Sequence, residues 1–474
     1  MLHTTLPNWL SYLENKHSQL TGKTIDLGLD RVKTIAQSMQ LLGDSSSQTS
    51  LKVLPHCQIV TVAGTNGKGS FIASCEALLL QQGLRVGAYT SPHILQFNER
   101  IRINGVSASD TFIMQALQTI HEHCEKNSIS LSYFEFTTLA GLYCFQQTEL
   151  DVILLEIGLG GRLDAVNIIE PDWAVITSIG IDHQDFLGDD LESIAYEKCG
   201  ILRANTPLIL LDSQPLQHLL AAKEQRNVVS VEDDFKIDIS ISEAGVRRWQ
   251  MQPTSNSLIQ LLKSDALPVI NDNGLSIPSQ AGAIILAQKI SLARNKALIE
   301  PEQIVSTLSG LSLAGRFQQF DLNGVRIVFD VAHNEQALNG LKQRLSERPL
   351  GIQGQGLSGE KGDKAKRIAV FTMLKDKPLE YCINLFKDDF FAWFLAEVDD
   401  ERAFKPSFIA EKLHDQGVHM ISVSKNFTQA FARLRQMCQT GDEIIIFGSF
   451  VSVTALIEKV SKLATPVNVS QSME

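Results

Sequence analysis

Short apolar runs alternate with segments of helical periodicity from about residue 57 to the end of the chain. An unbroken apolar run is typical of a strand covered on both faces, whereas apolar residues three and four positions apart indicate a helix. Repeated strand-then-helix units predict an α/β protein built on a doubly wound parallel sheet with helices on both faces.

The first half of the chain carries most of these units. Strands are predicted at Cys57–Ala63, Arg85–Tyr89, Asp151–Ile157, Trp173–Ile179 and Pro207–Leu211. Helices are predicted at Phe71–Gln82, Thr111–Lys126 with Asp110 as its N-cap, and Phe136–Gln147, and another ends at Gly200.

The pattern weakens between about residues 225 and 275. Partly polar runs at Val228–Val231, Lys236–Ile241 and Val246–Gln252 are interpreted as a small antiparallel insertion. Helices at Ala281–Arg294 and Pro301–Leu308 follow it.

The strand–helix alternation restarts after Gly310–Gly315, so we expect one domain over residues 1–312 and a smaller Rossmann-like α/β domain over 313–474. A Gly-rich loop at 351–362 is expected to be a surface excursion. The strands and helices predicted for this domain are Val325–Asp330, Glu335–Arg344, Arg367–Phe371, Pro378–Phe386, Phe391–Leu395, Ser407–His414, His419–Val423, Phe427–Gln436 and Glu443–Phe447.

Composition narrows the class of protein. A chain of 474 residues is too long for a single core, and its formal charge of −11 without a basic run argues against nucleic-acid binding. No apolar stretch approaches the ~20 residues that span a bilayer, and no signal peptide opens the sequence. Seven scattered cysteines are typical of reduced thiols, so we expect a cytoplasmic protein, and nothing indicates more than a monomer.

The most informative segment is Gly64–Ser70, a Gly-rich turn between a predicted strand and a predicted helix. Backbone N–H groups at such a turn converge on phosphate oxygens, Lys68 adds a positive charge, and the Ser70 hydroxyl can reach a magnesium ion. The spacing departs from the usual P-loop, because Val62 replaces its first glycine and Gly69 separates Lys68 from Ser70. The segment still predicts nucleotide phosphate binding.

Polar residues end two further strands of the same predicted sheet. Glu156 follows one apolar run and His183 follows the next, and the carboxyl ends of parallel strands share one edge. Each residue alone could be structural, but together with the P-loop they favour a shared magnesium–nucleotide site. In the second domain, Asp330 and His333 again follow a strand, and Arg316 could reach a phosphate from the linker.

Several longer strings resemble the folylpolyglutamate synthase and dihydrofolate synthase family of Mur-ligase-like, ATP-dependent amide ligases. They cover nearly the whole chain, from about residue 9 to 455. They are GTNGKGS (64–70), SPHILQFNERIRING (91–105), LEIGLGGRLDAVN (155–167), SIGIDHQDFLG (178–188), EKCGILR (197–203), GRFQ (315–318), FDVAHN (329–334) and FGSF (447–450), with bifunctional-type segments at 9–14 and 23–32.

The resemblance implies a site, residue by residue. Lys198, which alone would be interpreted as a solvated lysine near a helix end, matches the family's carboxylated lysine and would serve a second metal. Ser91, Glu156 and His183 would bind the first magnesium, and Lys68, Lys198, His183 and Glu156 would form the catalytic set. ATP would contact Thr65, Asn66, Gly67, Lys68, Gly69, Ser70, Gln280, Arg316, Asp330 and His333; the pterin would contact Asp26, Leu27, Gly28, Leu29, Ser132, Tyr133, Phe134, Glu135, Leu163, Asp164 and Ala165.

The resemblance also implies a reaction: L-glutamate is joined to dihydropteroate or to a folate through an acyl phosphate, with ATP and magnesium. The alternatives are a monofunctional folylpolyglutamate synthase, a Mur-type cell-wall ligase and a non-ligase P-loop protein. One departure concerns the nucleotide site, because Gln280 stands where the family usually has an asparagine.

Overall fold

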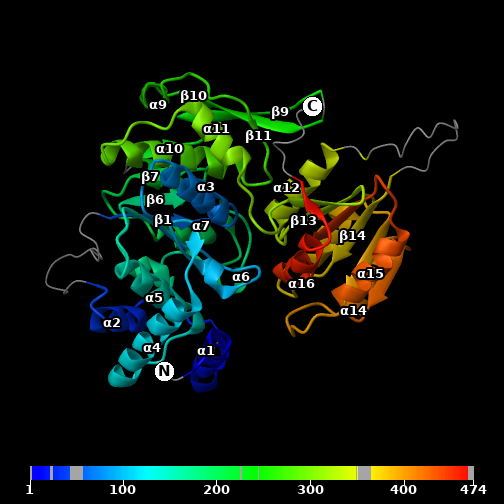
Figure 1. Cartoon of the computed structure of the whole chain (residues 1–474), viewed down its shortest axis with the longest axis horizontal. Coiled ribbons are helices and arrows are strands. Elements are labelled where there is room, and N and C mark those ends of the chain that lie inside the picture. The colour runs from blue at the N-terminus through cyan, green and yellow to red at the C-terminus, as the bar shows by residue number, and fades with distance from the viewer. Residues whose placement is uncertain are drawn as a thin grey trace.

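The computed structural model describes residues 3–21, 25–42, 57–224, 227–243, 245–348, 350 and 365–467. They form three sheets: an eight-stranded and a three-stranded sheet in the N-terminal part of the chain, and a seven-stranded sheet after residue 317. Figure 1 shows the three-stranded sheet above the eight-stranded one, and the C-terminal part beside both. The predicted α/β class with two doubly wound sheets is confirmed.

The eight-stranded sheet has the order β4-β3-β2-β5-β1-β6-β7-β8, parallel from β2 to β8 and antiparallel at the β3–β4 edge. Its strands are β1 (Gln58–Ala63), β2 (Val86–Tyr89), β3 (Ile101–Ile103), β4 (Val106–Ser107), β5 (Val152–Glu156), β6 (Trp173–Ile176), β7 (Leu208–Leu210) and β8 (Val228–Ser230).

Alternate residues of each central strand enter different cores. In β1, Ile59 and Ala63 face one core while Val60 and Val62 face the other, which is why these strands are apolar throughout. The first core is covered by α1 (Leu6–Thr21), α2 (Asp30–Ser38), α4 (Asp110–Asn127), α5 (Tyr133–Gln146), α7 (Leu191–Cys199) and α8 (Gln217–Glu224). The second core is covered by α3 (Lys68–Gln81), α10 (Ile277–Ala293), α11 (Pro301–Ser309) and the small sheet with α9 (Asn256–Leu262).

The small sheet is antiparallel, as predicted, in the order β11-β10-β9. Its strands are β9 (Phe235–Ile241), β10 (Arg247–Pro253) and β11 (Ile270–Asn271). The predicted strand Val228–Val231 does not belong to it, because β8 pairs in parallel with β7 and extends the large sheet. Helix α9 within this segment was not predicted.

The C-terminal sheet has the order β16-β15-β14-β17-β13-β12-β18. Helices α12, α13 and α14 cover one face, and α15 and α16 cover the other. Its elements are β12 (Gln318–Leu322), β13 (Val325–Phe329), α12 (Glu335–Ser346), β14 (Arg367–Phe371), α13 (Leu379–Phe386), β15 (Ala392–Ala396), α14 (Pro406–Asp415), β16 (Ile421–Ser424), α15 (Phe427–Met437), β17 (Glu443–Phe447), α16 (Phe450–Ser461) and β18 (Thr465–Pro466).

Several boundaries differ from the prediction. Ser109, not Asp110, caps α4, because its hydroxyl accepts from the N–H of Phe112. Strand β6 ends at Ile176 rather than Ile179, since the next residues leave the sheet to contact the 64–70 turn. The predicted loop at 351–362 lies outside the described residues. Helices α1, α2 and α16, the β3–β4 hairpin and strands β12 and β18 were not predicted.

None of the described helices is long and apolar enough to cross a membrane. Two short 3₁₀ helices, η1 (Phe97–Arg100) and η2 (Ala165–Ile168), and the single-turn α6 (Gln184–Leu187) complete the N-terminal part.

Asp272 joins the small sheet to the C-terminal part. Its buried carboxylate accepts from Arg247 of β10 at 3.2 Å and from Arg344 of α12. We expect Asp272→Ala to lower the free energy of unfolding by about 3–5 kcal/mol, because Arg344 loses its carboxylate partner and Arg247 keeps only Glu347 at 2.9 Å. Urea denaturation measures the change.

Asp233→Ala serves as the control, because that carboxylate is 62% exposed in its ion pair with Lys223. It should change the free energy of unfolding by about 1 kcal/mol or less. Equal effects of the two substitutions would show that Asp272 is not a structural junction.

Candidate functional site

The 64–70 turn connects β1 to α3 and approaches the end of β6 closely. A Cβ atom on Gly64, whose φ is +151°, would lie 1.9 Å from the Thr177 hydroxyl oxygen, so only glycine fits there. Gly67 precedes α3 with φ +91° and no side chain caps the helix. The first N–H groups of α3 are therefore open to an anion, as the sequence predicted.

The end of β6 holds this turn in place. The N–H of Thr65 donates to the Ser178 carbonyl at 2.7 Å, and the N–H of Asn66 donates to the Ser178 hydroxyl at 3.0 Å. The Thr65 hydroxyl accepts from the N–H of Gly180 and donates to its carbonyl. The shape of the turn is thus fixed without a ligand.

Lys68 is the first residue of α3, and its ammonium folds back onto the turn. Nζ donates to the carbonyls of Gly64 at 2.8 Å and Thr65 at 3.3 Å. Burial lowers the pKa of Lys68, and the charge of Glu156 opposes that shift. Ser70 accepts from the N–H of Ser276, which brings the N-terminus of α10 beside the turn.

Glu156 ends β5 and is 5% exposed. Oε2 accepts from the N–H of Ser91 at 3.1 Å, and burial raises the pKa of Glu156 against the attraction of Lys68. Burial lowers the pKa of His183 to about 4, which leaves its ring neutral and able to bind a metal. Carboxylate and hydroxyl oxygens are the ligands that magnesium prefers, and a neutral imidazole can also bind a divalent metal, so the predicted set of Ser91, Glu156 and His183 stays a prediction.

Within the described ranges, no three His, Cys, Asp or Glu side chains gather closely enough to hold a metal ion by themselves. Serine, phosphate and water oxygens would therefore have to complete the coordination of any magnesium ion, which is its usual behaviour at nucleotides.

Lys198 lies near the end of α7 and is 5% exposed, although an ammonium group is rarely buried without a partner. Burial and the charge of Lys68 lower the pKa of Lys198 to about 7. The side chain lines the same pocket as Glu156 and His183. The interpretation as a solvated surface lysine is wrong.

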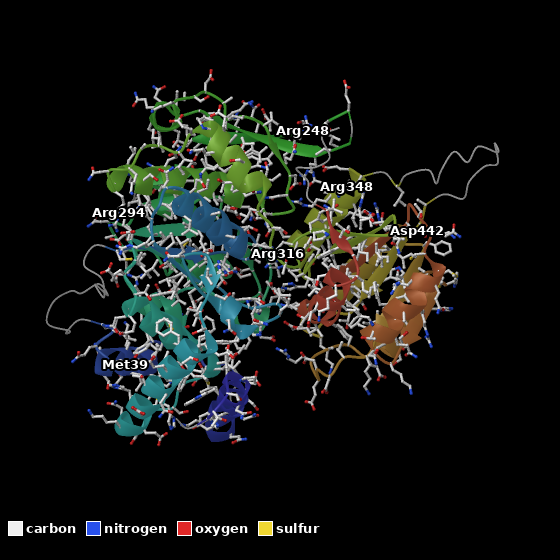
Figure 2. The ribbon with its side chains drawn as sticks, in the orientation of Figure 1. Met39, Arg248, Arg294, Arg316, Arg348 and Asp442 are labelled. Carbon is white, nitrogen blue, oxygen red and sulfur yellow. The ribbon has the colours of Figure 1, made fainter. Side chains whose placement is uncertain are left out.

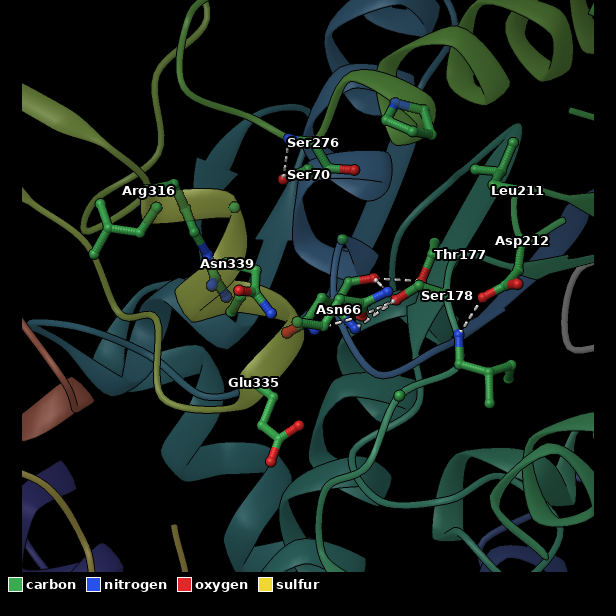
Figure 3. A pocket seen from close by; sticks show the side chains of 18 of the residues that line it. Asn66, Ser70, Thr177, Ser178, Leu211, Asp212, Ser276, Arg316, Glu335 and Asn339 are labelled. Carbon is green, nitrogen blue, oxygen red and sulfur yellow. Dashed lines mark hydrogen bonds between the residues drawn. The ribbon is translucent and has the colours of Figure 1, made fainter. Parts of the chain in front are cut away.

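Two pockets meet at the turn. The first, of about 750 Å³, has Arg316 and Asn339 on one side, Leu211 and Asp212 on the other, and Asn66 between them (Figure 3). The second, of about 1120 Å³, contains Glu156, His183 and Lys198. It is also lined by apolar side chains from both parts of the chain, among them Leu13, Ile25, Tyr133, Leu159, Phe186, Leu374 and Phe450.

Arg316 lines both pockets and lies between the two parts of the chain (Figure 2). Burial lowers its pKa, and Asp330 and Glu156 oppose that effect. Asp330 accepts from the N–H groups of Phe317 and Ala332 at 3.1 and 2.8 Å, and it lines the first pocket.

Polar contacts join the turn to the C-terminal part. Asn66 donates to the amide oxygens of Asn334 at 3.1 Å and Gln336 at 2.8 Å. Asp182 is next to His183. Its carboxylate accepts hydrogen bonds from the ammonium of Lys377 at 2.6 Å and from the side-chain amide of Asn334 at 3.0 Å. Burial opposes ionisation of Asp182, but a hydrogen bond with His333 and the neighbouring positive charges outweigh it and hold its pKa below the usual range.

The predicted pterin residues are less uniformly placed. Tyr133 alone among them lines the second pocket. Asp26 and Glu135 flank Arg31 at 2.9 and 3.1 Å. The carboxylate of Asp164 is 1% exposed and accepts three backbone N–H groups, so in this structure it shapes the 158–166 turn.

Ser132 and Glu135 form a reciprocal cap at the start of α5. The remaining predicted pterin residues lie along the same segments, and their substrate role stays a prediction. These residues are Leu27, Gly28, Leu29, Phe134, Leu163 and Ala165.

Gln280 is fully buried in α10 and does not line either pocket. Its Oε1 accepts from Asn273 at 3.0 Å, while Nε2 has no partner within the described chain. The predicted contact between Gln280 and a nucleotide would require this amide to move.

Sequence reasoning missed the residues that meet across the two parts. Asp182 lies beside the predicted His183 at a strand end and could have been found by the same argument. Lys377 and Gln336 follow strands of the other sheet, and nothing in the chain order indicates which residues they face.

Comparisons with known proteins agree with this geometry. The model of the Mur ligase middle domain matches residues 62–245, and that of the Mur ligase glutamate ligase domain matches residues 315–450. A dihydrofolate synthase/folylpolyglutamate synthase of Haemophilus influenzae is 35% identical, with 94% of this chain and 96% of the relative covered.

Solved structures extend the likeness to three dimensions. Escherichia coli FolC in complex with DHPP and ADP has a TM-score of 0.80 at 30% identity. A bifunctional folylpolyglutamate synthase/dihydrofolate synthase with Mn, AMPPNP and L-glutamate bound has a TM-score of 0.77 at 32% identity. Each comparison covers 97% of this chain and 98% of the other. The chain belongs to the dihydrofolate synthase/folylpolyglutamate synthase family of Mur ligases.

Proposed function

We propose that this protein joins L-glutamate to dihydropteroate, forming dihydrofolate, and to tetrahydrofolate and its polyglutamates, with ATP converted to ADP and phosphate. The observation that carries the proposal is the open phosphate turn at Gly64–Ser70, adjoining a large pocket that contains Glu156, His183 and Lys198. The relatives' names and the nucleotide, DHPP and glutamate in their structures support it.

The chemistry requires activation, because a carboxylate is a poor acyl electrophile. Transfer of the γ-phosphoryl group of ATP gives an acyl phosphate, which the neutral amine of glutamate attacks as phosphate leaves. Lys68, whose ammonium is held at the turn by the Gly64 carbonyl, would balance charge on the transferred phosphoryl group. The C-terminal part of the chain supplies Arg316, Asp330 and His333. Closure of the two parts over the substrates would therefore exclude water from the acyl phosphate.

Two magnesium ions are proposed. Ser91, Glu156 and His183 would hold one, and a carboxylated Lys198 would serve the other; the manganese in a relative's structure supports a divalent ion. Bound magnesium would neutralise charge on the phosphates. A carbamate forms from a neutral amine, and the lowered pKa of Lys198 is consistent with that.

The remaining assignments complete the proposal. Residues 1–312 would form the ATP-binding domain, with an insertion at about 225–275, and residues 313–474 the glutamate ligase domain; the matched family ranges support this division. We further propose a cytoplasmic monomer whose partners are small molecules.

Release of ADP tests the proposal directly. ATP, magnesium and glutamate are present throughout. The purified protein should release ADP when dihydropteroate is added and when tetrahydrofolate is added, but not when both acceptors are left out. Release of ADP with tetrahydrofolate but not with dihydropteroate would indicate a monofunctional folylpolyglutamate synthase. Release that needs neither acceptor would contradict the ligase assignment.

Glu156→Gln should weaken magnesium binding, because the change preserves shape and removes one negative charge. We expect the magnesium concentration for half-maximal rate to rise about tenfold or more, with partial rescue at high magnesium. Glu76→Gln, at a buried carboxylate paired with Arg102, is the control and should leave this concentration unchanged. An unchanged magnesium dependence in both Glu156→Gln and His183→Ala would exclude the shared site.

Lys198→Ala should abolish turnover, since the carbamate that serves the second metal is lost. Acetate should restore part of the rate, because a small carboxylate can occupy the space left by the side chain. The control is Lys289→Ala. Lys289 lies over the ring of Trp173 and outside both pockets, so this variant should keep the wild-type turnover rate without acetate. A bare ammonium on Lys198 in the active, metal-bound enzyme would refute the modification.

A further inference from the structure

Arg100, the last residue of η1, is a buried arginine without a carboxylate partner. It is 8% exposed, and in the described ranges no Asp or Glu oxygen lies within ion-pair distance of its guanidinium. The two other described arginines buried to this degree, Arg247 and Arg367, bond Asp272 at 3.2 Å and Glu443 at 2.7 Å. A buried guanidinium usually has such a partner, so the one missing at Arg100 suggests that a ligand supplies it.

The guanidinium is held firmly without an anion. Nε donates to Nδ1 of His93 at 2.9 Å, so this ring nitrogen acts as the acceptor and fixes the guanidinium. The guanidinium carbon lies 5.7 Å from the ring centres of both Phe97 and Tyr133. The adjacent Glu99 is not available, because its oxygens accept from the backbone N–H groups of residues 94–96.

The two terminal nitrogens of Arg100 remain unused. Neither Nη1 nor Nη2 makes a hydrogen bond to any described residue, and neither is sealed from solvent. A rigid fork of N–H donors that is stacked on aromatic rings and open at its tip matches the geometry of a carboxylate.

The guanidinium lies behind the wall of the second pocket, against Tyr133, and Arg100 itself does not line that pocket. Tyr133, on which the guanidinium stacks, lines that pocket together with Ser91 and Glu156. The Arg100 carbonyl accepts from the N–H of Thr90 at 2.9 Å, one residue before Ser91. The guanidinium is therefore separated from the second pocket by the Tyr133 side chain, and Arg100 does not belong to the sets proposed for ATP, metal or pterin.

We propose that Arg100 binds the non-reacting α-carboxylate of the terminal glutamate of a folate substrate. This inference rests on the proposed function. Dihydropteroate has one carboxylate, which reacts, whereas a folate presents an α-carboxylate beside the γ-carboxylate that reacts. An arginine that pairs with the α-carboxylate would therefore favour glutamate addition to folates without contributing to dihydrofolate synthesis.

Arg100→Gln separates the two activities. We expect kcat/KM for tetrahydrofolate to fall about 10- to 100-fold, as for the loss of a charge-assisted hydrogen bond, while kcat/KM for dihydropteroate changes less than about threefold. Arg100→Lys keeps the charge but loses the forked pair of donors. Its kcat/KM for tetrahydrofolate should therefore lie between those of wild type and Arg100→Gln. Arg102→Gln is the control, since Arg102 already pairs with Glu76, and should leave the ratio of the two activities unchanged.

Binding without ATP gives a second readout. Titration of the protein with pteroylglutamate and with pteroate should show weaker binding of pteroylglutamate alone in Arg100→Gln. Equal losses for both compounds, no loss for either, or variants that no longer fold would overturn the inference. A wild-type protein that releases ADP with neither substrate would instead contradict the proposed function, so the two failures are distinguishable.

Discussion

The site depends on one constraint, the parallel pairing of β5, β1 and β6. In that register Val62 lies opposite both Glu156 and Val175, so the three strands end side by side. The turn after β1 can then contact the residues after β6, and the Gly64 backbone approaches Thr177 where no side chain would fit. The phosphate-binding turn, the Glu156 carboxylate and His183 thus come together because three strands end at the same edge of the sheet.

The joint between the two parts of the chain has a different chemistry. Asn66, Asn334 and Gln336 meet through neutral amide hydrogen bonds, which exchange with water at small net cost. Two buried ion pairs also connect the parts: Asp182 with Lys377, and Asp272 with Arg344. Polar contacts of this kind can exchange with water when the parts separate, and that suits an enzyme whose substrates enter between them.

The parts of the fold that the sequence could predict are those with a local signal in the chain. Apolar strands buried on both faces and the residues after their carboxyl ends are local signals, so the central strands, the turn and the positions of Glu156 and His183 followed from the pattern. Helix α1 was missed although Leu6, Trp9, Leu10 and Leu13 follow helical spacing, because the strand–helix alternation was followed only from the first predicted strand onward. Strand β8 was assigned to the wrong sheet because its pattern does not reveal its partner.

The electrostatics of the site could not be predicted, because they arise from burial rather than from residue type. Burial lowers the pKa of Lys68, Lys198 and Arg316, and it raises the pKa of Glu156 and Asp330. Each shift reflects the poor solvation of a buried charge. A polyanion that binds with divalent cations would supply counter-charges to both sets at once. Because cationic and anionic side chains are both desolvated here, we expect ATP and magnesium to bind together more readily than either one alone.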